Sequence, residues 1–242
     1  MARLIGLGMM LVVAVAGCGN VAEEAPPAGP PEAEPVADIA AVAPEEVSVV
    51  LENDWARVMR FTLQPASELP RHDASGRAIY ALSDYTIEWA GGDEAPTERS
   101  WTAGQIHWHA GGPHAVRNTG SSVAEFLVIE RMGSELPAEG QTADTAQTGP
   151  TVPEHGQTLL ENEVMTVTEV SLGPGESTKA HLGGYRVVYA LSDYTIQWTE
   201  GDADPVEVSW SEGQSHWHEP AEHVADNAGD TPARYLVVTF LR

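Results

Sequence analysis

Hydrophobic and polar residues alternate along many short stretches of this chain, and a period of two predicts β-strands. Residues 55–63, 85–89 and 124–130 are typical, because they are rich in β-branched and aromatic residues and are bounded by Gly, Asp or Asn. The stretches lack the period of an amphipathic helix. We therefore expect an all-β protein that is built from short strands.

The same pattern occurs twice, with a constant offset of 109 residues between the copies. The octapeptide YALSDYTI stands at residues 80–87 and again at 189–196, and eight of the nine histidines fall into matched pairs. The repeat predicts two copies of one domain, at residues 46–132 and 158–242. Each copy holds about eight short strands, which favours a closed barrel or a two-sheet sandwich because these architectures leave few exposed edges.

Three segments lie outside the two copies. Residues 1–17 have a charged start and an apolar run too short to span a bilayer, which predicts an export signal. Residues 18–45 consist largely of Ala, Pro and Glu and predict a disordered tether, whereas residues 133–157 predict a linker between the domains. The end of the signal resembles the lipobox of bacterial lipoproteins, which implies cleavage before Cys18 and acylation of its thiol. We therefore expect an exported protein, anchored by lipid to the membrane of the bacterial cell envelope, on its periplasmic or outer surface.

The charge balance excludes one class of partner. The chain has 36 acidic residues against 12 basic ones, and Lys179 is its only lysine. A surface of this kind repels phosphates, so we expect no binding of nucleic acid. Cys18 is the only cysteine, so the domains must be stable without a disulfide bond.

Histidines dominate the candidate chemistry. The stretches GQIHWHAGGPHAVRN (104–118) and GQSHWHEPAEHVADN (213–227) each place three histidines around one tryptophan. Alternate side chains of a strand share a face, so His107 and His109 point one way and Trp108 the other. Either the histidines face inward, or the tryptophan does and lines a ligand pocket. We favour inward histidines, because a half-buried strand is expected to turn its rarer chemistry towards the site.

With the histidines inward, each domain presents up to four imidazoles to its interior. The candidate metal ligands are His72, His107, His109 and His114 in the first copy and His181, His216, His218 and His223 in the second. Such a site suits the divalent transition metals Zn, Cu, Ni or Fe, and without a carboxylate it is less suited to Mn. The alternative is a hydrogen-bonded network without metal. Further candidate pocket residues are Trp108, Trp217, Arg77, Arg186, Asn118 and Asn227.

Both arginines of that set have two interpretations. Arg77 and Arg186 occupy matched positions, and each either holds an anionic ligand at the mouth of its domain or pairs with a nearby surface carboxylate. The repeated SDY sequences have a simpler interpretation, in which Asp84 and Asp193 bind backbone amides in turns.

Two motifs in each copy resemble those of the cupin superfamily. Gly175 stands six residues before His181, as in the first cupin motif, and Ala66 stands at the same distance before His72. The glycine, histidine and asparagine of the second motif are matched by Gly104, His114 and Asn118 and by Gly213, His223 and Asn227. The chain is thus similar to a bicupin. The resemblance implies two tandem jelly-roll barrels, one for each copy.

The chain departs from the cupin pattern at two of the four metal ligands that the resemblance implies. Ala74 and Gly183 replace the second histidine of the first motif, and no carboxylate stands near the glutamate position, at residues 78–79 or 187–188. Each domain therefore keeps two of the usual ligands.

Three functions are compatible with these residues. We favour an envelope lipoprotein that binds a divalent metal or a small molecule through the histidines inside each barrel. The second is a metal-dependent enzyme of oxygenase, decarboxylase or isomerase type, which lacks an inward carboxylate as its base. The third is a metal-free structural or interaction module, because a fold alone does not decide function.

Overall fold

The computed structural model describes residues 38–91, 95–133, 135–137 and 154–241, and most of its regular structure is β-strand. In the first copy, a five-stranded antiparallel sheet has the order β1-β2-β9-β4-β7 and a four-stranded one has the order β3-β8-β5-β6. The strands are β1 (Val47–Glu52), β2 (Ala56–Leu63), β3 (Glu68–His72), β4 (Arg77–Ala81), β5 (Tyr85–Gly91), β6 (Thr97–Trp101), β7 (Ile106–His109), β8 (His114–Asn118) and β9 (Ala124–Arg131).

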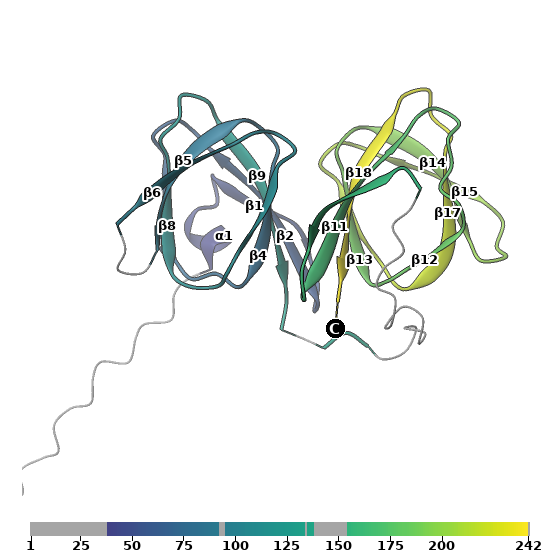
Figure 1. Ribbon diagram of the computed structural model, residues 1–242, viewed down its shortest axis with the longest axis horizontal. Coiled ribbons are helices and arrows are strands. Elements are labelled where there is room, and N and C mark those ends of the chain that lie inside the picture. The colour runs from purple at the N-terminus through teal and green to yellow at the C-terminus, as the bar shows by residue number, and fades with distance from the viewer. Residues whose placement is uncertain (1–37, 92–94, 134, 138–153, 242) are drawn as a thin grey trace, which may run out of the picture. The chain divides into compact units, whose positions relative to one another are not determined.

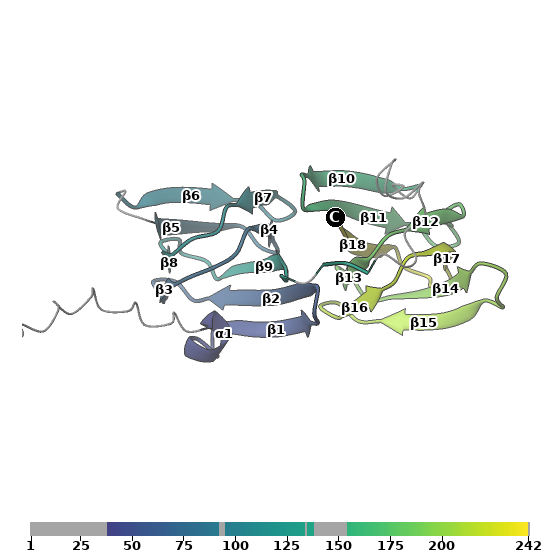
Figure 2. The same cartoon turned by 90° about the horizontal axis from the view of Figure 1, so that it is seen from below.

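The second copy repeats this topology strand for strand. Its sheets have the orders β10-β11-β18-β13-β16 and β12-β17-β14-β15. The strands are β10 (Gly156–Glu161), β11 (Met165–Leu172), β12 (His181–Gly183), β13 (Arg186–Ala190), β14 (Tyr194–Glu200), β15 (Val206–Trp210), β16 (Ser215–His218), β17 (Ala221–Asn227) and β18 (Ala233–Phe240). In both copies the two sheets face each other and enclose an interior (Figures 1 and 2). The predicted all-β fold of two tandem jelly-roll barrels is confirmed.

Strand β4 shows how both faces of one sheet are used. All five of its residues are buried, although an alternating pattern predicts that one face of the strand is exposed to solvent. Ile79 and Ala81 belong to the core of the first barrel, whereas Ala78 and Tyr80 belong to a second core on the outer face of the sheet. The equivalent strand β13 is buried along its whole length for the same reason.

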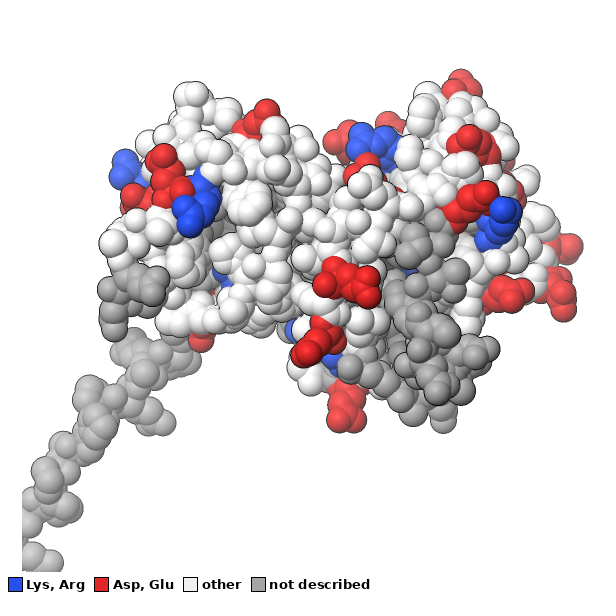
Figure 3. Space-filling model, in the orientation of Figure 1, with Lys and Arg blue, Asp and Glu red and all other residues white. Residues whose placement is uncertain are grey.

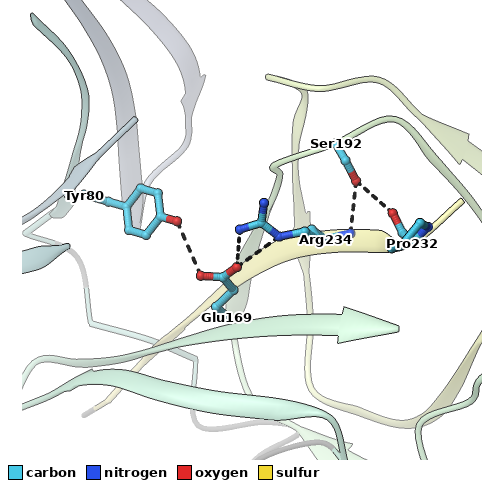
Figure 4. Close-up of polar contacts among 5 residues, drawn as sticks. All are labelled: Tyr80, Glu169, Ser192, Pro232 and Arg234. Carbon is cyan, nitrogen blue, oxygen red and sulfur yellow. Dashed lines mark hydrogen bonds and ion pairs between the residues drawn. The ribbon is translucent and has the colours of Figure 1, made fainter. Parts of the chain in front are cut away.

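That outer core is shared by the two barrels. It joins Val58 and Ile129 of the first barrel to Val167 and Leu236 of the second. Tyr80 adds a polar contact, because its hydroxyl donates a hydrogen bond to Glu169 Oε2 at 3.4 Å, and Glu169 also pairs with Arg234 (Figure 4). The five-stranded sheets of the two barrels therefore pack against each other through an apolar contact.

A short helix, α1 (Ile39–Val42), precedes the first strand and corrects one prediction. Asp38 caps it by accepting a hydrogen bond from Ala40 N at 2.9 Å. Ile39 and Ala43 are buried in the core of the first barrel. The expected disordered tether is therefore wrong for residues 38–45, because two apolar side chains in an alanine-rich stretch find a core to pack against. The expected signal and Cys18 lie outside the described residues.

The described ends of the expected linker are also ordered. Leu136 is buried in the shared core, and Glu135 O accepts a hydrogen bond from Trp55 Nε1 at 3.1 Å. Strand β10 starts at Gly156, inside the range given to the linker. Residues 138–153 lie outside the described part of the chain.

Carboxylates are spread over the visible face of the molecule, with few Lys or Arg side chains among them (Figure 3). Within the described residues, no helix has the length and apolar character needed to cross a membrane. The aspartates of the repeated SDY sequences lie in turns as predicted: Asp84 accepts from Ala103 N and Asp193 from Glu212 N, both at 2.8 Å.

Candidate ligand site

Side chains from several strands meet in the interior of the first barrel, around a cavity of about 400 Å³. The register of the strands brings them together: His72 pairs with His114 across β3 and β8, and Arg77 lies between His109 of β7 and Glu130 of β9. The polar part of the wall includes His72, Arg77, His109, His114 and Glu130, and the apolar part includes Ile79, Trp89 and Phe126.

The two histidines of the HWH sequence have different surroundings. His109 lines the cavity, whereas the His107 ring is stacked on Trp101, with ring centroids 3.6 Å apart and planes inclined by 9°. Both ring nitrogens of His107 are buried, and neither has a hydrogen-bond partner among the described residues. Burial lowers the pKa of His107 to about 3, so the ring is neutral at pH 7.

Trp108 points to the opposite side of the strand, as alternation requires. It packs in the core shared by the barrels, as does Trp217, whose ring lies 5.5 Å from that of Trp55. The expectation that these tryptophans line a ligand pocket is therefore wrong. The physical reason is that the other barrel covers the outer face of the five-stranded sheet, so this face does not contact solvent or a ligand.

Asn118 and Asn227 also lie outside the cavity. Asn118 Nδ2 donates hydrogen bonds to Leu63 O at 2.9 Å and to Ser122 O at 2.8 Å, and its Oδ1 accepts from Gly120 N at 3.0 Å. Asn227 makes the equivalent three bonds. Both asparagines are buried parts of a turn whose backbone they satisfy, so their assignment to a ligand pocket is corrected to a structural role.

Arg77 is the charged centre of the cavity wall. It is 3% exposed, and it donates hydrogen bonds from Nη1 to Ser75 O at 3.1 Å and from Nη2 to His114 Nε2 at 2.9 Å. A guanidinium can only donate, so His114 Nε2 accepts and Nδ1 carries the proton, which it shares with Gly112 O at 3.2 Å. Arg77 therefore fixes the tautomer of His114.

The histidines around Arg77 are neutral. Burial and the positive charge of Arg77 lower the pKa of His114 to about 3. The pKa values of His72 and His109 are also lowered by burial, with a further contribution from Arg77. An arginine keeps its proton at neutral pH even when burial lowers its pKa. The imidazoles around Arg77 are thus uncharged, whereas other parts of the cavity wall carry the cations Arg57 and Arg131 and the carboxylates of Asp38, Asp73 and Glu130.

Glu130 is a site residue that the sequence analysis missed. It is 8% exposed, lies opposite Arg77 in the register of β4 and β9, and lines the cavity. A signal was present, because the alternation that places Phe126 and Val128 in the barrel core continues to Glu130. Glu130 is not one of the residues matched between the two copies, since Thr239 occupies its position in the second barrel.

The second barrel has the same set of cationic and imidazole groups but little space. His181, Arg186, His218 and His223 surround a cavity of about 40 Å³, which has room for a few water molecules at most. Arg186 Nη2 lies 3.4 Å from both ring nitrogens of His223. Burial is the main cause that lowers the pKa of His218 to about 2 and that of Arg186 to about 10.

One tryptophan in each barrel explains the difference in volume. The Trp198 ring lies 4.2 Å from His223 and 4.8 Å from His218, whereas Trp89 lies 6.1 Å from His114 and 5.9 Å from His109.

Gly91 makes the position of Trp89 sterically accessible. A Cβ atom at Gly91 would lie 2.0 Å from Trp89 Cη2, a contact that real structures do not tolerate. The residue at this position in the second barrel is Glu200, so Trp198 has no equivalent place and lies over the imidazoles.

The residues of the cavity do not fit a metal ion in this arrangement. Among the described residues, no three His, Cys, Asp or Glu side chains come together as metal ligands. Arg77 instead donates to the His114 nitrogen lone pair that a metal would need, and its charge opposes a second cation. In this structure the eight candidate histidines therefore do not come together as the expected Zn, Fe, Ni or Cu site, and His107 and His216 are stacked on tryptophans.

Comparisons with solved structures show the fold. AerE from Microcystis aeruginosa is 17% identical, with 81% of this chain and 93% of that chain covered and a TM-score of 0.59. A variant of oxalate decarboxylase from Bacillus subtilis is 13% identical, with 81% and 76% covered and a TM-score of 0.56. The formate complex of the Lactobacillus farciminis oxalate decarboxylase is 12% identical, with 78% and 77% covered and a TM-score of 0.53.

These likenesses establish a bicupin fold, as the two motifs implied. At the level of sequence, no protein-family model matches the chain, and no curated protein is similar to it.

Proposed function

We propose that this protein of bicupin fold binds a small organic carboxylate inside its first barrel, with Arg77 as the charged anchor. The observation that carries the proposal is the buried guanidinium of Arg77 in the wall of a cavity of about 400 Å³. A guanidinium has five N–H donors, and a planar carboxylate accepts from two of them at once. The hydrogen bonds from Arg77 to Ser75 and His114 leave donors for such a ligand.

The rest of the wall suits a small anion with an apolar part. Neutral His72 and His109 supply hydrogen-bonding groups without a charge of their own, and Ile79 and Trp89 supply apolar surface. His72 Nδ1 donates to Pro70 O at 2.8 Å, which leaves its Nε2 as an acceptor for a donor group of the ligand and not for its carboxylate. Pockets for small molecules are typically roughly 300–1,000 Å³, so the first barrel has enough room and the second has not.

Two structural neighbours guide the choice of ligands to test. Oxalate decarboxylase is named for its action on a dicarboxylate, and the Lactobacillus farciminis enzyme forms a complex with formate. A panel of formate, acetate, propionate and oxalate therefore covers one and two carboxylates at increasing size.

The proposal is tested by thermal shift with this panel on the full-length chain and on R77Q. We expect at least one carboxylate to raise the melting temperature of the parent chain and to have at least tenfold weaker affinity for R77Q. The matched control is R186Q in the second barrel, which should keep the affinity of the parent. Equal affinity of R77Q and the parent chain would overturn the proposal.

The cation that holds the ligand belongs to the chain itself, so binding should not require a metal. We expect the affinity for carboxylate to be the same before and after treatment with EDTA. Loss of binding on chelation, with recovery on addition of Zn²⁺ or Fe²⁺, would instead support the metal site that the histidines predicted.

The proposed location is the bacterial cell envelope, with the chain attached through lipid on Cys18. The support is the sequence of residues 1–18, a charged start, an apolar run and a single cysteine. Mass spectrometry of the purified N-terminal peptide should show an acylated Cys18. The variant C18S should carry no acyl group on this peptide, and an acylated C18S peptide would contradict attachment at Cys18.

A further inference from the structure

We propose that Glu130 makes the first barrel selective for carboxylates that carry a hydroxyl or ammonium group on the adjacent carbon. The role of Glu130 rests on the proposed function, because it concerns the ligand that Arg77 anchors. The carboxylate of Glu130 is the only acidic group of β9 on the cavity wall, at a position where the alternating inward residues are otherwise apolar.

The position of Glu130 sets the distance between the two functional groups of the ligand. Arg77 and Glu130 are directly opposite each other in an antiparallel pair, and side chains in such a pair start about 5 Å apart. Because both side chains line the same cavity, a ligand whose carboxylate contacts Arg77 turns its nearest atoms towards Glu130. A donor on the carbon next to the carboxylate is among these atoms, whereas a donor several carbons away is not.

The chemistry of the Glu130 carboxylate also favours a ligand with a hydrogen-bond donor next to its own carboxylate. A glutamate carboxylate accepts hydrogen bonds, and that of Glu130 belongs to the wall of the cavity in which a ligand would lie. Both Arg77 and Glu130 are in the described part of the chain, and no ion pair joins them, although the charge of Glu130 acts on Arg77. A hydroxyl or ammonium group of the ligand would supply a donor to Glu130.

The second barrel gives an internal comparison. It keeps the arginine and the four histidines, but Thr239 replaces the glutamate and the cavity shrinks to about 40 Å³. The first barrel thus carries a carboxylate at this position, in the wall of a cavity with room for a ligand, whereas in the second barrel the charge of Glu200, from strand β14, acts on Arg186.

The test compares ligands of the same carbon skeleton by titration calorimetry on the full-length chain. Propionate carries no donor, lactate carries a hydroxyl and alanine an ammonium group on the adjacent carbon. We expect lactate or alanine to bind at least tenfold more tightly than propionate. In E130T, which takes the residue of the second barrel, the ratio should fall to about one while propionate still binds. In the matched control T239E the ratio should stay that of the parent.

A second variant distinguishes the two donors. E130Q keeps an acceptor oxygen and loses the charge, so it should retain most of the preference for lactate and lose a preference for alanine. Equal affinity of the parent chain for all three ligands, or an unchanged ratio in E130T, would overturn the role of Glu130 and leave carboxylate binding at Arg77 intact. Failure of all three ligands to bind would overturn the role of Glu130, and only failure of formate, acetate and oxalate as well would overturn carboxylate binding at Arg77.

Discussion

Gly91 shows how one missing side chain determines what a barrel can hold. The Trp89 ring lies where a Cβ of residue 91 would be, and the space between Trp89 and the imidazoles is the candidate site. At the equivalent position Glu200 carries a side chain, and Trp198 lies against His223. The two barrels therefore differ in cavity volume through their packing, although their histidines and arginines are the same.

We predict that G91E closes the first cavity and that E200G enlarges the second. In G91E, Trp89 must rotate towards His114, so carboxylate affinity should fall at least tenfold while Arg77 is unchanged. Crystal structures of both variants measure the cavity volumes directly. A G91E structure with Trp89 in its original place and an open cavity would refute the steric explanation.

The buried histidines lead to a second prediction at the residue scale, which concerns the dependence of stability on pH. Their folded pKa values are depressed, to about 3 for His107 and His223 and about 4 for His216. Above pH 6.5 neither state is protonated and these groups have no effect. Below pH 6.5 the unfolded chain binds protons that the folded chain does not, so stability falls as the pH is lowered towards 4.

Thermal unfolding between pH 7.5 and 4.5 measures this loss. The melting temperature should fall over this range, and the slope should be shallower in the double variant H107F/H216F, which keeps the ring stacks and removes two titrating groups. A melting temperature that stays constant or rises on acidification would contradict burial of neutral histidines.

At the scale of secondary structure elements, the sequence predicts the strands well and the helix not at all. Period-two alternation identifies the strands, since one face of each strand is apolar. The repeat then predicts that two domains have the same architecture. Helix α1 is missed because four residues are too few to show a helical period, and its stability comes from contacts of Ile39 with the barrel.

The candidate site could be predicted in part for similar reasons. Matched pairs identify His72, His109, His114 and Arg77, but pairing between copies hides Glu130, whose partner is a threonine. The burial of His107 and the packing of Trp108 depend on contacts between sheets and between barrels, and local sequence patterns do not encode such contacts.

We predict that I39A lowers the free energy of unfolding by about 2 kcal/mol, near the lower end for buried Ile-to-Ala changes because Ile39 borders a cavity. V42A changes a half-exposed side chain of the same helix and should cost less than about 0.5 kcal/mol. Urea denaturation measures both. Equal and small effects would show that α1 does not stabilise the barrel.

At the scale of the whole molecule, the shared core couples the two barrels. Fully buried side chains of both five-stranded sheets form one cluster, and Trp55 of the first barrel stacks on Trp217 of the second. Charged pairs flank this core at equivalent positions with reversed order: Arg60 with Glu125 in one barrel and Glu169 with Arg234 in the other. Arg60, Glu125 and Arg234 line one cavity together with Tyr80 and Tyr189 of the shared core.

We predict a single unfolding transition for both barrels. In differential scanning calorimetry, the calorimetric and van't Hoff enthalpies should agree, and L236A, in the shared core, should shift the one transition downward. Two separate transitions, with only the second barrel affected by L236A, would show that the barrels fold independently.

The central claim is that one barrel of two binds a carboxylate at a buried arginine. Its most direct test is the stoichiometry of binding, measured by titration calorimetry with the tightest ligand of the panel. The account predicts one ligand for each chain, lost in R77Q and kept in R186Q. Two ligands for each chain, or binding that R77Q retains in full, would contradict it.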